Sequence, residues 1–208
     1  MKRQELNLSL YFVADPHACA GRDIVDVVKR AVAGGATLIQ LRNKIDSADI
    51  IRNQALSIQK ILADSQVPFL INDHVEVVAE INADGVHIGQ GDMNADQARE
   101  LIGHEAILGL TAFTHDHYAA IDPDIVDYVG TGPVFPTKTD KGKPVLGVDG
   151  FSKLIRHAPV PVVGIGGITE QNAVDVMKAG AHGVAMMRSI SEADDPCIAT
   201  QRLLKSLS

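Results

Sequence analysis

Cysteine is scarce in this chain of 208 residues, which contains only Cys19 and Cys197. Neither belongs to a CxxC pair or stands beside a plausible set of zinc ligands, so the sequence offers neither a disulfide framework nor a cysteine-based zinc site. We interpret both residues as free thiols of a protein from a reducing compartment.

Long apolar runs and an excess of positive charge are missing as well. No segment approaches the roughly 18 apolar residues of a membrane span, and the basic amino terminus lacks the apolar run of a signal peptide. With 26 acidic against 19 basic side chains, the net charge of −7 argues against a nucleic-acid-binding surface. We therefore expect a soluble, cytoplasmic protein that acts on small molecules, without membrane or nucleic-acid partners. The sequence does not decide whether the chain forms a homodimer.

Common catalytic motifs are also absent. The chain has neither a GxSxG nor an HExxH motif, so a nucleophilic hydrolase or a zinc hydrolase lacks support. The segment GIGGIT does not have the GxGxxG spacing of a dinucleotide-binding turn, which argues against an NAD-dependent enzyme.

What the chain does contain is a regular alternation of short apolar runs, rich in Val and Ile, with longer segments of helical periodicity. Such alternation predicts βα units and a parallel sheet. The eight candidate strands are 8–14, 37–42, 67–72, 84–88, 106–111, 126–130, 160–165 and 183–187. Eight units predict a compact (β/α)₈ TIM barrel in the α/β class, as a single domain over 1–208 that a helix at about 196–206 closes. A flavodoxin-like sheet is the alternative, but it leaves about three units unassigned.

Two of these runs are followed by carboxylates, Asp73 and Asp92. On neighbouring parallel strands the two side chains emerge side by side, at the end of the barrel where active sites lie. Two carboxylates suit a hard divalent cation that keeps several waters and takes further ligands from a substrate phosphate. Asp73 alone is equally compatible with a helix N-cap, but capping does not explain a pair.

Other residues at strand ends suit phosphate binding. Arg42 and Lys44 lie two positions apart in QLRNK, so both can face one site, although two surface cations are the alternative. Gly166 and Gly167 suggest a phosphate-binding turn, or simply a tight turn that needs small residues. We interpret His87 as a hydrogen-bonded packing residue. The long loop at 131–147 is expected to fold over a phosphorylated ligand, with a flexible surface loop as the alternative.

Five segments in this order resemble the thiamine phosphate synthase family: QLRNK, LINDHVEVVAEINADGVHIGQGD, DYVGTGPVFPTKT, PVVGIGGIT and GAHGVAMMRSI. The resemblance covers most of the chain. It implies an enzyme that joins 4-amino-2-methyl-5-pyrimidinylmethyl diphosphate to hydroxyethylthiazole phosphate, giving thiamine phosphate and diphosphate. In the family's dissociative mechanism the diphosphate leaves first, and the thiazole nitrogen then traps the pyrimidine cation.

The resemblance also implies a site. Asp73 and Asp92 correspond to ligands of the cofactor Mg²⁺. The residues that correspond to the pyrimidine diphosphate site are Gln40, Leu41, Arg42, Asn43, Lys44 and Asn72. Those that correspond to the thiazole phosphate site are Thr137, Thr139 and Gly167, with the backbone at Met187 and Arg188. Thr111, Lys138 and Lys141 are further predicted substrate-binding residues. Arg42, Lys44 and Thr111 are the predicted catalytic residues.

This chain departs from the family pattern at three positions. Thr111 stands where serine is usual and keeps the hydroxyl group. Asp140 stands where lysine is usual, and Lys141 or Lys143 is the candidate replacement. Arg188 stands where a small serine is usual and adds a cation near the expected thiazole phosphate.

Two alternative functions stay open. A thiazole tautomerase shares the barrel but uses a histidine after the fifth strand, where this chain has Phe113. A non-catalytic regulator that binds thiazole phosphate or thiamine phosphate is compatible with the departure at Asp140, and only turnover separates it from the enzyme.

Overall fold

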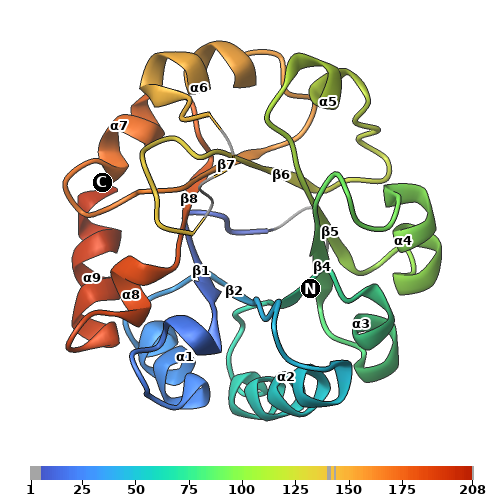
Figure 1. Cartoon of the computed structure of the whole chain (residues 1–208), viewed down its shortest axis with the longest axis vertical. Helices are drawn as coiled ribbons and strands as arrows, with labels where there is room; N and C mark the ends of the chain where they lie inside the picture. The colour runs from blue at the N-terminus through green and yellow to red at the C-terminus, as the bar shows by residue number, and fades with distance from the viewer. Residues whose placement is uncertain (1–5, 140–141, 143, 208) are drawn as a thin grey trace.

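Eight parallel strands form a closed barrel in the computed structural model, which describes residues 6–139, 142 and 144–207 (Figure 1). Each strand pairs with the next along the chain, and β8 pairs with β1. The strands are β1 Leu10–Ala14, β2 Leu38–Leu41, β3 Phe69–Asn72, β4 Gly85–Ile88, β5 Ile107–Thr111, β6 Tyr128–Thr131, β7 Val162–Ile165 and β8 Gly183–Met186. The predicted (β/α)₈ fold is confirmed, and every strand overlaps one of the eight predicted runs.

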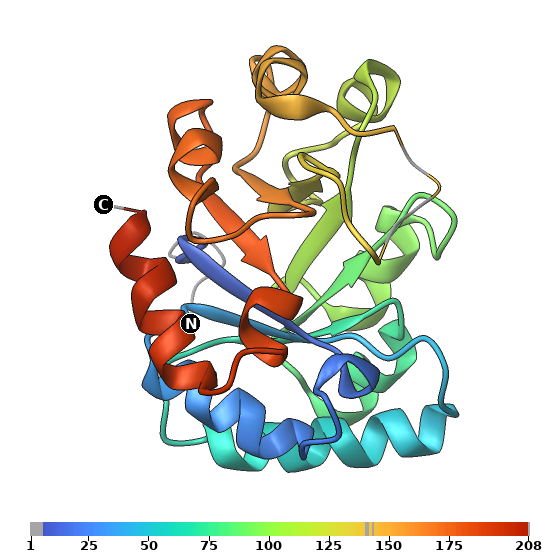
Figure 2. The ribbon, with the colours of Figure 1, turned by 60° about the vertical axis from the view of Figure 1, so that its left-hand side comes forward.

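Helices surround the barrel as an outer ring (Figure 1). A short 3-10 helix, Pro16–Ala18, precedes them. They are α1 Ile24–Ala33, α2 Ala48–Leu62, α3 Val75–Ile81, α4 Ala95–Ile102, α5 His115–Ala119, α6 Gly147–Ile155, α7 Ala173–Lys178, α8 Arg188–Ser191 and α9 Pro196–Ser206. The last helix, α9, packs beside α1 and closes the ring, as expected (Figure 2). Within the described residues, no helix combines the length and the apolar composition that crossing a membrane requires.

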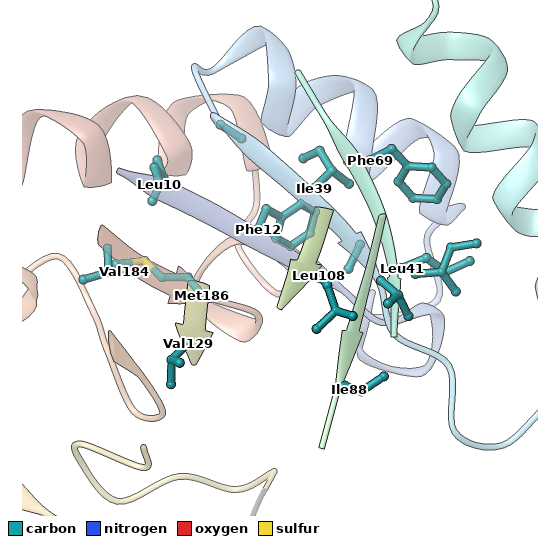
Figure 3. Packing of buried hydrophobic residues seen from close by; sticks show 14 of the residues in the cluster. Leu10, Phe12, Ile39, Leu41, Phe69, Ile88, Leu108, Val129, Val184 and Met186 are labelled. Atoms are coloured by element: carbon teal, nitrogen blue, oxygen red, sulfur yellow. The ribbon is translucent and has the colours of Figure 1, made fainter. Parts of the chain in front are cut away.

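The strand alternation produces two hydrophobic layers. One set of side chains points outward and packs against the helices, including Leu10, Phe12, Ile39 and Leu41 (Figure 3). The other set fills the barrel interior, which contains Leu8, Tyr11, Val13, Leu38, Leu70, Ile107, Tyr128, Val163 and Ala185. Because inward positions near the carboxyl ends of the strands are polar, the same alternation places Gln40, Asn72, His87 and Thr111 above this interior layer.

A buried ion pair joins α4 to the start of β6. One guanidinium nitrogen of Arg99 lies 2.9 Å from Asp127 Oδ2, and the two side chains are 4% and 8% exposed. Asp127 Oδ2 also accepts a hydrogen bond of 2.7 Å from the amide of Leu108 on β5. The carboxylate therefore ties a strand, the neighbouring strand and a helix together on the outside of the barrel.

Replacing Asp127 with alanine should lower the free energy of unfolding by about 3 kcal/mol, because the buried Arg99 guanidinium would lose its ion pair with Asp127 while keeping its charge. Urea denaturation followed by circular dichroism measures the change. The matched control is Asp49→Ala, since Asp49 pairs with Arg52 at 2.8 Å but is 79% exposed, and this variant should lose at most about 1 kcal/mol. Equal losses of unfolding free energy in the two variants would contradict a stabilising role for the buried Arg99–Asp127 pair.

Candidate functional site

A cavity of about 820 Å³ opens at the carboxyl ends of the strands. This volume lies within the range of small-molecule binding sites. The strands and their following loops bring most of the predicted site residues to its wall. These residues are Gln40, Arg42, Lys44, Asn72, Asp73, Asp92, Thr111, Thr137, Lys138, Thr139, Gly167, Met187 and Arg188.

Two predicted residues do not reach the cavity with their side chains. Leu41 alternates with Gln40 along β2, so it points outward and is fully buried among helix-facing residues (Figure 3). Asn43 is 2% exposed, and its amide nitrogen donates to Asp46 at 2.7 Å and to Gln54 at 3.0 Å. Strand alternation and loop hydrogen bonds thus turn these two side chains away from the cavity, and their predicted contact with the substrate stays a prediction. Asp140, Lys141 and Lys143 lie outside the described residues.

Two aspartates meet at the rim, after the neighbouring strands β3 and β4. Asp73 has a backbone φ of +64°, which is uncommon for a residue other than glycine. Its Oδ2 lies 2.8 Å from Lys44 Nζ, whereas the N-cap of α3 is His74. Asp92 Oδ2 accepts a hydrogen bond of 2.7 Å from the Gly89 amide. Asp73 therefore faces the cavity and does not cap a helix.

The two carboxyl groups influence each other's ionisation. Burial raises the pKa of Asp73, and the neighbouring Asp92 adds to this effect although Lys44 opposes it. Burial works against ionisation of Asp92 too, but hydrogen bonds from the Gly89 amide and from the Asp73 carboxyl lower its pKa. The pKa values of Asp73 and Asp92 therefore shift in opposite directions, as expected for two neighbouring carboxyl groups that repel each other when both are ionised. A bound cation would reduce this repulsion.

The donor set fits a hard divalent cation with few protein ligands. Both candidate ligands are carboxylates, the type that Mg²⁺ prefers. Among the residues that the structure describes, no cluster of three or more His, Cys, Asp or Glu side chains could hold a metal ion. A cation between Asp73 and Asp92 would accordingly complete its coordination with water or with ligand oxygens.

Cationic and amide groups line the neighbouring wall. Arg42 is held by Asp15 at the end of β1, with 2.5 Å between a guanidinium nitrogen and Asp15 Oδ2. The side-chain amide nitrogen of Asn72 is buried and has no hydrogen-bond partner within the described part of the chain. Because an unpaired buried donor is costly, this nitrogen points to an acceptor that a ligand supplies.

The loop after β6 is packed tightly against the end of β7. Gly166 and Gly167 have φ angles of +97° and +63°. A Cβ atom on Gly166 would lie 2.6 Å from Pro133 Cα, and one on Gly167 would lie 2.5 Å from the Pro136 carbonyl oxygen. The glycine pair is therefore required by the close approach of this loop, which carries Thr137, Lys138 and Thr139 to the cavity wall.

Arg188 lies at the cavity rim opposite that loop. Its guanidinium forms an ion pair with Glu192, one turn further along α8. Its Nε atom is buried and has no partner among the described residues. The side chain is thus a cation with unused hydrogen-bonding capacity. The preceding residue, Met187, places its Sδ 3.9 Å from the Thr139 hydroxyl.

Three residues of the barrel interior were either not predicted from the sequence or predicted in another role. His87 lines the cavity, and both of its ring nitrogens are engaged, with the Tyr128 hydroxyl at 2.8 Å and Thr111 Oγ1 at 3.0 Å. Its interpretation as a hydrogen-bonded residue is right, but it belongs to the cavity wall. Tyr11 and Tyr128 were not singled out, although counting alternate positions along β1 and β6 would have turned both inward.

Comparisons with known proteins agree with this geometry. A family model described as thiamine monophosphate synthase matches residues 10–190. Thiamine-phosphate synthase of Psychrobacter sp. (strain PRwf-1) is 41% identical over 206 residues, which cover 95% of this chain and 94% of the relative. The enzyme of that name from Bacillus licheniformis is 43% identical over 194 residues, covering 91% and 86%. A solved thiamine phosphate pyrophosphorylase from Pyrococcus furiosus superposes with a TM-score of 0.87 at 31% identity, covering 99% and 96%. The chain belongs to the thiamine monophosphate synthase family.

Proposed function

We propose that this chain joins 4-amino-2-methyl-5-pyrimidinylmethyl diphosphate to hydroxyethylthiazole phosphate, yielding thiamine phosphate and diphosphate. Membership of the family makes the chain a transferase of thiamine biosynthesis. The observation that carries the proposal is the convergence of the Asp73–Asp92 pair, two strand-end cations and the unpartnered Asn72 amide on one cavity. Such a set suits a diphosphate together with a divalent cation.

The proposed cofactor is Mg²⁺, held by Asp73 and Asp92. When bound, it would neutralise negative charge on the diphosphate and so assist its departure. Lys44 Nζ lies 2.8 Å from Asp73 Oδ2 in this structure. When the cation binds Asp73 in its place, Lys44 would turn toward the diphosphate. The buried Asn72 amide nitrogen would donate to the same group.

In the first step the bond between the pyrimidinylmethyl carbon and the diphosphate oxygen breaks, and its electron pair leaves with the diphosphate. Arg42 and Lys44 stabilise the growing charge, so their interaction is stronger in the transition state than in the ground state. In the second step the lone pair of the thiazole nitrogen forms the new C–N bond. Neither step transfers a proton, which agrees with a site whose histidine, His87, already uses both ring nitrogens.

The thiazole phosphate is proposed to bind between the loop after β6 and the end of β8. Thr137, Thr139 and Lys138 supply hydroxyl groups and a cation from one side. Gly167 and the main chain at Met187 and Arg188 lie on the other side. Arg188 would exchange its pair with Glu192 for the phosphate, which also gives its unpartnered Nε an acceptor.

Gly167→Ala should raise the KM for the thiazole phosphate by about 10-fold while changing kcat less, because the new Cβ displaces the loop that carries Thr137 and Thr139. Steady-state kinetics with the pyrimidine diphosphate held saturating measure this. The matched control is Gly150→Ala in α6, where a Cβ would meet only Leu146 Cβ at 3.7 Å. If Gly167→Ala had the same KM for the thiazole phosphate as the unmodified protein, the loop would not be part of the phosphate site.

The direct test is an assay with both substrates, with and without Mg²⁺, that follows release of diphosphate. Product formation that requires Mg²⁺ supports the proposal, and no product at saturating substrate removes it. Binding without turnover would instead favour the non-catalytic regulator. Phe113 lines the cavity at the position where the tautomerase has its histidine, so that function has no support here. The single domain, the cytoplasmic location and the homodimer stay predictions.

A further inference from the structure

A line of hydrogen bonds crosses the barrel interior at the floor of the cavity. It starts at Gln40 on β2, whose amide nitrogen donates to the Tyr11 hydroxyl. From there it runs to the Tyr128 hydroxyl at 2.8 Å, to His87 Nδ1 at 2.8 Å, and from His87 Nε2 to Thr111 Oγ1 at 3.0 Å. We call these five residues the interior network. Only its two ends, Gln40 and Thr111, belong to the predicted substrate site.

The barrel reserves space for this network. A Cβ atom on Gly109 would lie 2.2 Å from Cζ of Tyr128, and one on Gly130 would lie 3.1 Å from Cε1 of His87. Tyr11 and Tyr128 are 2% and 0% exposed. Larger residues on β5 and β6 would therefore force the tyrosine and histidine rings out of their present positions.

The Tyr11 and Tyr128 hydroxyl groups keep their protons, because burial raises the pKa of both. Each of these protons needs an acceptor inside the barrel, so the contacts of the network determine how its protons are arranged.

The arrangement follows from the Gln40 end. Because the amide nitrogen can only donate, the Tyr11 oxygen accepts from it. Within the described residues Tyr128 is then the one remaining acceptor for the Tyr11 proton. Reversing the direction would leave that proton buried without an acceptor, at a cost of about 1–3 kcal/mol. Tyr128 in turn donates to His87 Nδ1, and the imidazole proton resides on Nε2.

We propose that the interior network fixes the hydrogen-bonding polarity of the cavity: Thr111 accepts from His87 Nε2 and presents its own hydroxyl proton to the substrate, while Gln40, whose amide nitrogen is turned toward Tyr11, offers its amide oxygen to the cavity. Tyr11, Tyr128 and His87 are therefore positioning residues that act through Thr111 and Gln40. The polarity is a property of the protein, whereas the identity of the ligand rests on the proposed function.

This polarity selects a class of ligand. At Gln40 the cavity takes a donor, such as the exocyclic amino group of an aminopyrimidine, and at Thr111 it takes an acceptor. A pyrimidine that carries an oxo group in place of the amino group would set two acceptors against each other at Gln40. Sites built around such pairs reject the mismatched analogue strongly, because a buried polar group is left unpaired.

The first test reads the tautomer of His87 in the free protein by ¹⁵N NMR of histidine-labelled chain. The chain has eight histidines, and comparison with His87→Gln assigns the signals of His87. The expected result at neutral pH is a proton on Nε2 and a lone pair on Nδ1. A proton on Nδ1, or a charged ring, overturns the proposal. Because this measurement needs no turnover, it can be read even if the proposed reaction fails.

The second test is a double-mutant cycle on kcat/KM with Tyr128→Phe and Thr111→Val, which remove one hydroxyl each and nearly keep the side-chain shape. If Tyr128 acts through Thr111, the double variant should retain at least about 5-fold more activity than the product of the two single effects predicts. Tyr118→Phe is the control, since the Tyr118 hydroxyl is bonded to Thr131 at 2.6 Å and neither residue is a member of the interior network.

The control variant should combine with Thr111→Val multiplicatively. If the effects of Tyr128→Phe and Thr111→Val on kcat/KM also multiplied, the two residues would not be coupled, and the proposal would be overturned. If Tyr128→Phe does not fold, Tyr11→Phe takes its place in the same cycle, because it breaks the network one residue earlier. Absence of turnover in the unmodified protein would remove the proposed function instead, so the two failures are distinguishable.

Discussion

Replacing Asp92 with asparagine is expected to lower Mg²⁺-dependent kcat/KM on the order of 10³-fold while the barrel stays folded. Asparagine keeps an oxygen that can accept from the Gly89 amide, at 2.7 Å in this structure, so the turn after β4 is preserved. What the variant would lose is one of the two carboxylates proposed to hold the cation. Initial rates over a range of Mg²⁺ concentrations, with circular dichroism as a check on folding, measure the effect.

The matched control for this prediction lies four residues further along the chain. Asp96 is an exposed carboxylate in the first turn of α4, so Asp96→Asn removes the same charge from the same region without touching the cavity. Its activity should stay within about 2-fold of the unmodified protein. If Asp92→Asn also turned over normally, Asp92 would not be a metal ligand.

The architecture was predictable because it depends on a repeated local pattern. Apolar runs at regular intervals predict eight strands, and each run overlaps an observed strand. The two aspartates could be placed at the cavity for the same reason, since the segments that follow the strands lie at the active end of a barrel. Local sequence did not decide between a ligand and an N-cap for Asp73, because the answer depends on its left-handed backbone conformation.

The missed features depend on contacts between strands. Tyr128 stands in an apolar run, and its ring turns inward beside Gly109, with which it is in register on the neighbouring strand. Nothing within the β6 segment specifies this pairing. Leu41 stands inside the contiguous motif QLRNK, and alternation along β2 turns its side chain outward, away from the cavity.

The Lys44 side chain is the other point at which a single substitution should have a large effect. Lys44→Ala is expected to lower kcat by about 10²-fold, because in the proposed mechanism the ammonium group would stabilise the charge that grows as diphosphate leaves. Lys44→Arg keeps the charge and should recover part of the loss. Lys60→Ala, at an exposed position in the last turn of α2, is the control and should behave like the unmodified protein.

The same variant should also change the pH dependence. Lys44 lowers the pKa of Asp73, opposing the effects of burial and of Asp92. Removing the ammonium group therefore raises the pKa of Asp73 further, so the carboxyl stays protonated, and unable to bind a cation, up to a higher pH. The acidic limb of the pH profile of kcat/KM should accordingly move to higher pH in Lys44→Ala, and increasing the Mg²⁺ concentration should move it back. A profile that falls in height without moving would mean that Lys44 acts on the diphosphate alone and does not control the ionisation of Asp73.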